Sequence, residues 1–461
     1  MTTGEDSSRP RGAVRRAAVV ALCVAAACAP TGEGVTALEG ATLLDGSGGA
    51  PITGSIILVE AGHIKAVARA GEVDVPSGAV HVNVSGKTII PGLIDAHAMV
   101  ERWAALRYLA WGVTTVRDFG GAGDSALALK NELGLGTTLG PRMFSSGQPI
   151  DGDPPFDARA TRVATGAGAR KAVDQLAIGG ADYVAVSSAI TPALLKPLLE
   201  EATTLRLPIA ARPGQVDALT FARAGALSLE QLAGVVGLAA PDPTPFTRAY
   251  AQPAGGWTVE ETAWGLLDSE SVARAARTLA AARVAVVPTL TAHEMLARAN
   301  DPALLARPTM EDVPANAGHV RDIAALLRST GWGPGDFAAF RRARPRQDQF
   351  VREFERAGGL VAAGSGAAGP LLVPGAALHD ELEQLVLAGF TPLQAIGAAT
   401  RRAAQLLRAD SLGRVAPGAV ADLVTLNSNP TDDIAATRDI AWVMTRGRIV
   451  YPDSLRSAWR R

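Results

Sequence analysis

Short apolar runs separated by glycine occur at both ends of the chain. Near the start these runs are TLLDGSG, GSIILVEAGHIKAVA and VHVNVSGKTII, and near the end they are ADLVTL and IAWVMTRGRIVYP. In VEAGHI two apolar runs meet at a glycine turn, which predicts a β-hairpin. We expect residues 31–90 and 405–461 to form one small β-sandwich that takes strands from both ends of the chain.

The middle of the chain, residues 91–404, alternates apolar runs with helical or mixed stretches. Repeated strand and helix segments are typical of parallel βα units, and eight in succession predict an α/β fold of the (β/α)8 type, a TIM barrel. The eight apolar runs are TIIPGLIDAH, GVTTVRDF, PRMFSSG, DYVAVSS, LPIAARP, LSLEQLAG, VAVVPTL and GLVAAGS.

One helix between these runs can be placed closely. In TPALLKPLLEEATTL, Thr191 suits the N-cap position and Pro192 the first helical position. Four leucines at 194, 195, 198 and 199 then form an apolar stripe at helical spacing. Two longer stretches, 234–271 and 293–336, mix proline, glycine, tryptophan and charged residues, and we expect elaborated loops there, over the mouth of the barrel.

Composition excludes some function classes. The chain has 461 residues, of which 48% are hydrophobic and 19% charged, with a net charge of −1. This length supports a large core, and the balanced charge predicts no nucleic-acid partner. Ligand or partner must therefore be sought among small molecules and proteins.

The first thirty residues have the pattern of a secretory signal. Four arginines between residues 9 and 16 precede the apolar run AAVVALCVAAAC, which is too short to span a bilayer. Three alanines before Cys28 resemble a lipobox, so Cys28 is expected to carry a lipid anchor; simple cleavage and a soluble periplasmic protein is the alternative. Both cysteines lie in this segment, and either reading predicts export to the cell envelope without disulfides.

The segment PGLIDAHAM holds the first candidate chemistry. A strand running into His-x-His places two imidazoles on one face, because side chains two apart point the same way. His97 takes the first position here, but Met99 takes the second.

Several motifs together resemble the amidohydrolase superfamily, in its imidazolonepropionase-like and prolidase-like branch. GKTIIPGLIDAH, GVTTVRDFGG and GPRMFSSG resemble the first three barrel strands of that family. LHDELEQLVLAGFTPLQAIGAAT followed by LGRVAPGAVADLVTLNSNP resembles its exit from barrel to sandwich. The resemblance covers nearly everything after the signal segment, and it implies a hydrolase of C–N bonds built on a barrel with a small sandwich.

The resemblance also implies a metal centre, usually zinc, which lowers the pKa of a bound water. Five of the six family ligand positions lack their ligand in this chain: only His97 is kept, while the others are Met99, Ala185, Arg212, Gln231 and Gly366. We therefore expect no metal cofactor, although zinc is expected in active members of the family.

Arg212 makes metal binding still less favourable. A dication about 4 Å from a guanidinium would be opposed by about 8 kcal/mol at an effective dielectric of 20. Two roles for Arg212 remain open: it binds a carboxylate or phosphate of a ligand, or it forms a structural ion pair with a carboxylate such as Glu230.

His97 also has two interpretations, a surviving catalytic or binding residue and a strand-end histidine with a local hydrogen bond. Acid–base catalysis without metal would pair it with Asp118 or Asp151. Met99 and Ala185 are expected to fill the vacated space as apolar side chains. A rebuilt metal centre would have to use Asp118, Asp151, Asp153, His293, Glu294, His319 or His379, none of which has paired ligand spacing.

These observations favour a catalytically inactive homologue in the cell envelope. It would bind a small, anionic ligand or a protein partner through Arg212, Gln231 and His97. The alternative is an active hydrolase of cyclic amide or dipeptide C–N bonds with a rebuilt site, since fold alone does not establish function.

Overall fold

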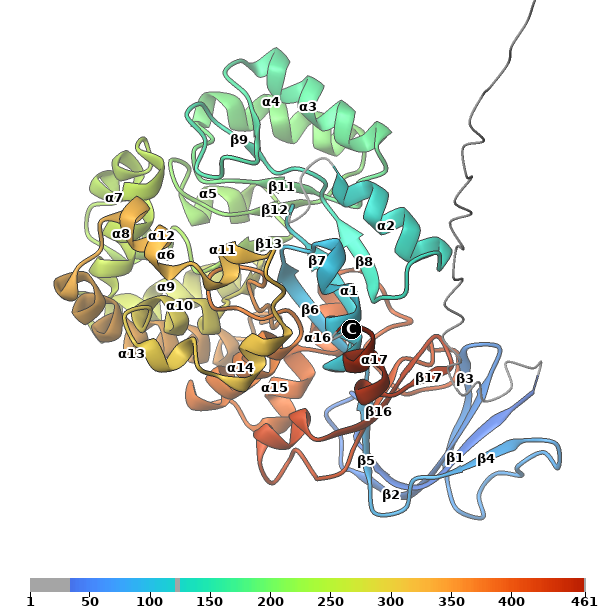
Figure 1. Cartoon of the computed structure of the whole chain (residues 1–461). Helices are drawn as coiled ribbons and strands as arrows, with labels where there is room; N and C mark the ends of the chain where they lie inside the picture. Colours follow the sequence, from blue (N-terminus) through green and yellow to red (C-terminus); the bar gives the residue numbers. More distant parts are fainter. Residues whose placement is uncertain (1–33, 121–124, 460–461) are drawn as a thin grey trace, which may run out of the picture. The chain divides into compact units, whose positions relative to one another are not determined.

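The structure is a computed structural model that describes residues 34–120 and 125–459 (Figure 1). The predicted signal segment, including Cys28, lies outside the described residues. Within the described residues, no helix is both long and apolar enough to cross a membrane.

One sheet combines strands from both ends of the described chain (Figure 1). β15 pairs antiparallel with β5, with Val424 opposite Ile90. The strand order is β17-β16-β15-β5-β1-β2-β3, with β4 paired to β1. The strands are β1 (Thr36–Leu43), β2 (Ile52–Glu60), β3 (His63–Arg69), β4 (Val80–Asn83), β5 (Thr88–Pro91), β15 (Leu423–Leu426), β16 (Ile440–Thr445) and β17 (Arg448–Val450). A sandwich with the expected boundaries stays a prediction.

The hairpin predicted at VEAGHI is confirmed. β2 and β3 pair antiparallel with Glu60 opposite His63, so a two-residue turn joins them. Both turn residues, Ala61 and Gly62, have positive φ, of 49° and 78°. This is the geometry that matches the twist of two-residue hairpins.

The middle of the chain forms parallel strands in two sheets, with orders β6-β7-β8 and β10-β9-β11-β12-β13-β14. An α/β fold with parallel strands was predicted, but the pairing does not form one continuous ring. The strands are β6 (Leu93–Ala98), β7 (Val113–Asp118), β8 (Arg142–Ser145), β9 (Ile150–Asp151), β10 (Thr161–Arg162), β11 (Val184–Val186), β12 (Ile209–Ala211), β13 (Ser228–Glu230) and β14 (Ala285–Val287).

The eighth predicted strand, in GLVAAGS, is reduced to an isolated bridge between Val361 and Val286. Backbone hydrogen bonds still place this segment between β14 and β6. Val286 N donates to Leu360 O, and Ala96 N donates to Ala363 O, both at 2.9 Å. Glycine is required within this segment, because a Cβ added at Gly364 would lie 2.5 Å from Val287 Cγ1 and 2.7 Å from His97 Cβ.

Helices follow most of the parallel strands. They are α1 (Ala105–Ala110), α2 (Ala126–Leu135), α3 (Gly166–Ile178), α4 (Pro192–Thr204), α5 (Ala218–Arg223), α6 (Val235–Ala239), α7 (Thr244–Ala249), α8 (Pro253–Trp264), α9 (Ser269–Ala281), α10 (Leu290–Ala297), α11 (Gly318–Arg321), α12 (Ile323–Thr330), α13 (Pro334–Arg356), α14 (Ala376–Leu387), α15 (Pro392–Ala398), α16 (Arg401–Leu406) and α17 (Pro452–Trp459). The 3-10 helices are η1 (Arg102–Ala104), η3 (Pro302–Leu304), η4 (Pro308–Asp312) and η5 (Ile434–Arg438).

The predicted helix at TPALLKPLLEEATTL is confirmed as α4, with Thr191 at the N-cap and Pro192 at the first position. Leu194, Leu195 and Leu198 are buried, as the stripe predicts, while the fourth leucine is half-buried. The expectation of loops over 234–271 and 293–336 is wrong in large part, because α6–α8 and α10–α12 lie there. Their prolines stand at or near helix starts, where a missing N–H costs little.

Candidate functional site

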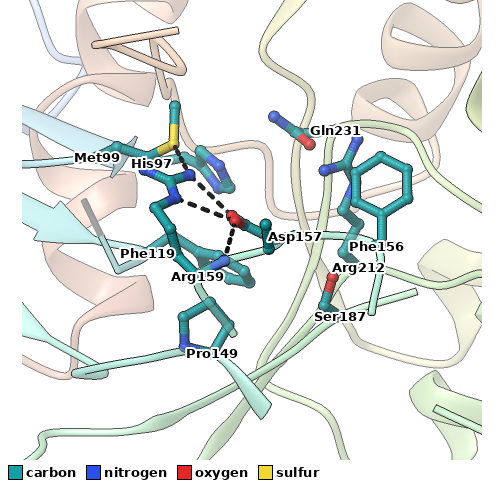
Figure 2. A pocket seen from close by; sticks show the side chains of 11 residues that line it. His97, Met99, Phe119, Pro149, Phe156, Asp157, Arg159, Ser187, Arg212 and Gln231 are labelled. Carbon is teal, nitrogen blue, oxygen red and sulfur yellow. Dashed lines mark hydrogen bonds and ion pairs between the residues drawn. The ribbon is translucent and has the colours of Figure 1, made fainter. Parts of the chain in front are cut away.

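A cavity of about 270 Å³ lies beside the carboxyl ends of β6, β11, β12 and β13, and four of the predicted site residues line it (Figure 2). In parallel α/β folds this edge is where ligands bind. The lining residues are His97, Met99, Phe119, Pro149, Phe156, Asp157, Ala158, Arg159, Ser187, Arg212 and Gln231. The structure therefore brings together His97, Met99, Arg212 and Gln231 at one site.

Arg212 follows β12 and lies on one wall of the cavity. Its guanidinium carbon lies 4.0 Å from the ring centroid of Phe156, a cation–π contact. Its buried Nε has no hydrogen-bond partner, and Arg212 forms no ion pair with any described residue. Burial lowers the pKa of Arg212, and the negative charge of Asp157 opposes that change.

The structural role weighed for Arg212, an ion pair with Glu230, is wrong. Glu230 is the last residue of β13, and both of its carboxylate oxygens bond other residues. Its Oε2 accepts from His97 Nδ1 at 2.7 Å, and its Oε1 accepts from Arg117 and from Ser228. Arg117 lies on the buried strand β7, and its guanidinium forms the ion pair with Glu230. Arg212 therefore lies at the cavity without an ion pair among the described residues.

Glu230 is an ionised group inside the protein. Burial alone would raise its pKa, but the charge of Arg117 and the hydrogen bonds from His97 and Ser228 outweigh burial and hold the pKa below its usual value. Arg117 is itself buried and lies 5.1 Å from the ring centroid of Tyr183. A buried carboxylate with these donors stays charged.

His97 is the last residue but one of β6, and its ring is held on two sides. Its ring stacks on Phe119 with centroids 4.8 Å apart, and Nδ1 is bonded to Glu230. Nε2 makes no hydrogen bond with the described residues, and His97 lines the cavity. Both interpretations of His97 therefore remain compatible with the structure. Its ring has a local hydrogen bond, and the same residue lines the cavity.

Asp118, weighed as a partner for His97, holds the backbone instead. Its carboxylate accepts from Val100 N and from Ser145 Oγ, both at 2.8 Å, and Asp118 is outside the cavity lining. Asp95, which precedes the histidine by two residues, is also buried; burial raises its pKa to about 6, and hydrogen bonds from Ser365 oppose the rise. The carboxylate that reaches His97 Nδ1 is Glu230.

Asp151, the other carboxylate weighed as a partner, anchors the loop after β9. Its oxygens accept backbone N–H groups of Gly152 at 2.9 Å, Phe156 at 2.6 Å and Ala189 at 2.8 Å. It therefore positions the segment that supplies Phe156 and Asp157 to the cavity, and it does not face the cavity itself.

Replacing this anchor tests its role. Asp151→Ala should loosen the loop, because three N–H groups lose a charged acceptor, each such bond contributing about 1.5–3 kcal/mol. We expect faster tryptic cleavage after Arg159, measured by limited proteolysis with mass spectrometry. Asp153→Ala, in the same loop but exposed, is the matched control. Equal cleavage of the two variants would contradict the assignment.

On the opposite wall of the cavity, next to Met99, Arg159 and Asp157 form an ion pair. Arg159 donates to Asp157 at 2.8 Å and to Met99 Sδ at 3.0 Å (Figure 2). The carboxylate of Asp157 balances Arg159, so the pair adds no net charge. Met99 also lines the cavity, and its expected role as an apolar filler stays a prediction.

Gln231 follows Glu230 in a left-handed conformation, with φ of 58°. Its main-chain oxygen accepts from His293 Nε2 at 3.2 Å, which holds the residue in place. Its side-chain Oε1 is buried without a hydrogen-bond partner. The amide is thus a polar group at the cavity wall that a ligand can satisfy.

The remaining family ligand positions hold no side chain suited to a metal. Ala185 is buried with Phe119, Tyr183 and Ala210 below the cavity. Gly366, with φ of 70°, donates its N–H to His97 O at 2.8 Å. Ala185 offers only a methyl group and Gly366 has no side chain, so neither residue can coordinate a cation through a side chain.

The donor set at the cavity does not fit zinc. A zinc site needs three or four imidazole, thiolate or carboxylate ligands, and among the described residues that line the cavity the only imidazole belongs to His97. The carboxylates of Glu230 and Asp157 are bonded to arginines. Among the residues that the structure describes, no group of three His, Cys, Asp or Glu side chains could hold a metal ion.

The other residues weighed for a rebuilt centre lie outside this lining. Each has a partner of its own: His293 bonds Glu261, Glu294 bonds Arg344, His319 pairs with Glu101, and His379 bonds Thr437. Asp153 is exposed. The structure does not bring them together.

Sequence reasoning missed Arg117, Phe119, Phe156, Asp157 and Arg159. Arg117 had a usable signal, because a charged residue inside a fully buried strand requires a charged partner. The loop residues 156–159 had none beyond their place after a strand, since DGDPPFDARA has the composition of an ordinary turn.

Comparisons with known proteins agree on the fold. No family model matches the chain, and no curated protein matches its sequence. Among solved structures, bottromycin amidohydrolase is 20% identical with a TM-score of 0.70 over 92% of this chain and 89% of that one. A Xaa-Pro dipeptidase with bound methionine is 18% identical, with a TM-score of 0.67 over 90% and 100%. The A. niger ochratoxinase is 17% identical, with a TM-score of 0.65 over 91% and 96%. The predicted likeness to amidohydrolase-superfamily proteins is confirmed for the fold.

Proposed function

We propose that this chain, which has the amidohydrolase-superfamily fold, binds a small carboxylate-bearing molecule without a metal ion. The observation that carries this proposal is Arg212, whose buried Nε has no partner at the wall of the cavity. A carboxylate would supply the missing acceptor and the missing charge, and the planar guanidinium can bind it through two parallel hydrogen bonds.

The other cavity residues support the sign and the size of this ligand. Asp157 neutralises Arg159, so Arg212 sets a net positive charge inside the cavity. Gln231 adds an amide whose oxygen is without a partner. A volume of about 270 Å³ is near the lower end for ligand pockets, which favours a small molecule over a peptide segment.

The wider proposal keeps the predicted architecture and location. The parallel strands form a (β/α)8 barrel that closes through Leu360–Ala363, the terminal strands form a sandwich, and the protein works in the cell envelope, tethered through Cys28. Loss of five metal ligands supports a role without metal-dependent hydrolysis.

Calorimetric titration of the chain from residue 29 onwards with glutarate, acetate and benzoate tests the binding. We expect Arg212→Ala to weaken glutarate binding about 10- to 100-fold, because a hydrogen bond to a charged group contributes about 1.5–3 kcal/mol. Arg223→Ala removes the same charge at an exposed site on α5 and is the matched control. Unchanged binding in Arg212→Ala, or no binding of any carboxylate, would overturn the proposal.

Metal analysis tests the competing function, an active C–N hydrolase with a rebuilt centre. Near-stoichiometric zinc, manganese or iron after dialysis, together with amide hydrolysis that a chelator removes, would favour that function over ours. The neighbouring solved structures include a dipeptidase and amidohydrolases, so dipeptides and cyclic amides are the substrates to try.

A further inference from the structure

We propose that His97 is a general base that hydrolyses esters of the carboxylate-bearing molecules held by Arg212. The inference rests on the proposed function, because Arg212 would bind the carboxylate of such an ester. Glu230 would be a positioning residue, since it contacts His97 and does not line the cavity.

The hydrogen bonds of His97 decide which nitrogen is basic. Glu230 is ionised and can only accept, so the proton of a neutral His97 ring lies on Nδ1. The lone pair is then on Nε2, which has no partner among the described residues. A carboxylate that fixes the tautomer and orientation of a histidine is the arrangement found in hydrolytic triads.

Arg117 keeps the carboxylate of Glu230 in its ionised form. Its guanidinium bonds Glu230 and is buried, so the carboxylate stays negative and can stabilise the imidazolium that forms when His97 accepts a proton. The stack on Phe119 fixes the plane of the ring. A histidine that served only in packing would not require a buried Glu230–Arg117 ion pair bonded to its Nδ1.

The cavity places this base opposite the carboxylate anchor. Figure 2 shows His97 and Arg159 on one side of the cavity and Arg212 with Gln231 on the other. A carboxylate on Arg212 leaves the rest of a short molecule between these walls. Arg159 and Gln231 carry N–H donors that can stabilise a developing oxyanion.

The reaction is balanced with water alone. Nε2 takes a proton from water as the water oxygen bonds to the acyl carbon, and the carbonyl electron pair moves to the oxygen. The tetrahedral intermediate then collapses, the C–O bond to the alcohol breaks, and the leaving oxygen takes the proton back from Nε2. The products are an alcohol and a carboxylic acid, which releases its proton to solvent.

Esters are favoured over amides by the residues present. An amine must be protonated before a C–N bond breaks, and polarisation of an amide carbonyl is the task of a metal in the related fold. The donor set here does not fit a metal. An alkoxide or phenoxide leaves more readily, so a single histidine suffices.

Two esters that differ only in a carboxylate test the inference. Mono(4-nitrophenyl) glutarate carries a free carboxylate, and 4-nitrophenyl butyrate, which has the same acyl chain, does not; release of 4-nitrophenolate is followed by absorbance. We expect wild type to prefer the glutarate ester in kcat/KM and Arg212→Ala to lose that preference. His97→Asn should lower kcat by about 10²- to 10⁴-fold for both esters. His319→Asn, at an exposed histidine, and Arg223→Ala are the controls.

Binding of free glutarate separates this inference from the proposed function. A His97→Asn protein that binds glutarate as wild type does is folded, and its loss of hydrolysis then supports the base. If wild type binds glutarate but hydrolyses neither ester above buffer, or if His97→Asn keeps the wild-type rate, the inference is wrong while the binding function stands. If glutarate does not bind, both are wrong.

A measurement on the unmodified sequence avoids any folding defect in the variant. Diethyl pyrocarbonate should acylate His97 in wild type, glutarate should slow that reaction, and hydroxylamine should restore hydrolysis. Mass spectrometry locates the modified histidine. Full modification of His97 with hydrolysis unchanged would overturn the inference.

Discussion

Glu230→Leu should lower the free energy of unfolding by about 3–5 kcal/mol, because it leaves the charged guanidinium of Arg117 buried without its partner. Both side chains are almost completely inaccessible, at 1% for Arg117 and 0% for Glu230. The same change removes the acceptor of His97 Nδ1. Urea denaturation followed by circular dichroism measures the loss.

The cost should come from the unpaired charge, and a second variant isolates it. Adding Arg117→Met to Glu230→Leu removes the charge, so the double variant should recover much of the lost stability. The pair Arg102 and Glu132 is exposed and serves as control: Glu132→Leu should have a much smaller effect. A double variant less stable than Glu230→Leu would contradict this account.

Local patterns in the sequence predict local structure well here. The hairpin at Ala61–Gly62 follows from a short-range turn signal, and α4 follows from its cap, its proline and its leucines. In both cases the information lies within about fifteen neighbouring residues. The segment GLVAAGS carried an equally apolar pattern, but it forms only an isolated bridge, and its Gly364 packs closely on Val287 and His97. Packing of that kind is not visible in the pattern.

The sequence predicted four of the residues that line the cavity, but not the ion pair of Glu230. His97, Arg212 and Gln231 could be assigned to one site because the resemblance to the amidohydrolase superfamily puts each at a metal-ligand position of that family. The partner of Glu230 could not be chosen from sequence, since Arg117 lies on β7, Arg212 directly follows β12, and only the direction of the side chains decides between them. In the structure Glu230 bonds Arg117, and Arg212 is therefore available to bind a ligand.

Stability should fall as the pH rises from 5 to 8, with Glu381 as the main contributor. This carboxyl lies on α14, is fully buried, and burial raises its pKa from 4.5 to about 8 despite the hydrogen bond from Thr291 N at 2.7 Å. The folded state thus holds a proton that the unfolded chain releases above its own pKa. The stabilisation is complete below pH 4.5 and is lost as the pH approaches 8, at about 1.4 kcal/mol per pH unit.

Glu381→Gln removes this group while keeping the shape of the protonated side chain. At pH 8 the variant should be more stable than wild type by up to about 4 kcal/mol, and near pH 4.5 the two should agree within about 1 kcal/mol. Glu260, whose pKa burial raises to about 7, is unchanged in both proteins, so some decline with pH remains in the variant. Urea denaturation at each pH gives the comparison.

The control for this effect is Glu383→Gln on the same helix, at a side chain that is 37% exposed and paired with Arg438. It removes the same charge from α14 but not a buried one, so its stability should follow the wild-type dependence on pH. Parallel curves for Glu381→Gln and wild type would show that Glu381 ionises in the folded state as it does in the unfolded chain. The slope between pH 5 and 8 would then have to come from other buried carboxyls such as Asp95, whose pKa burial raises to about 6.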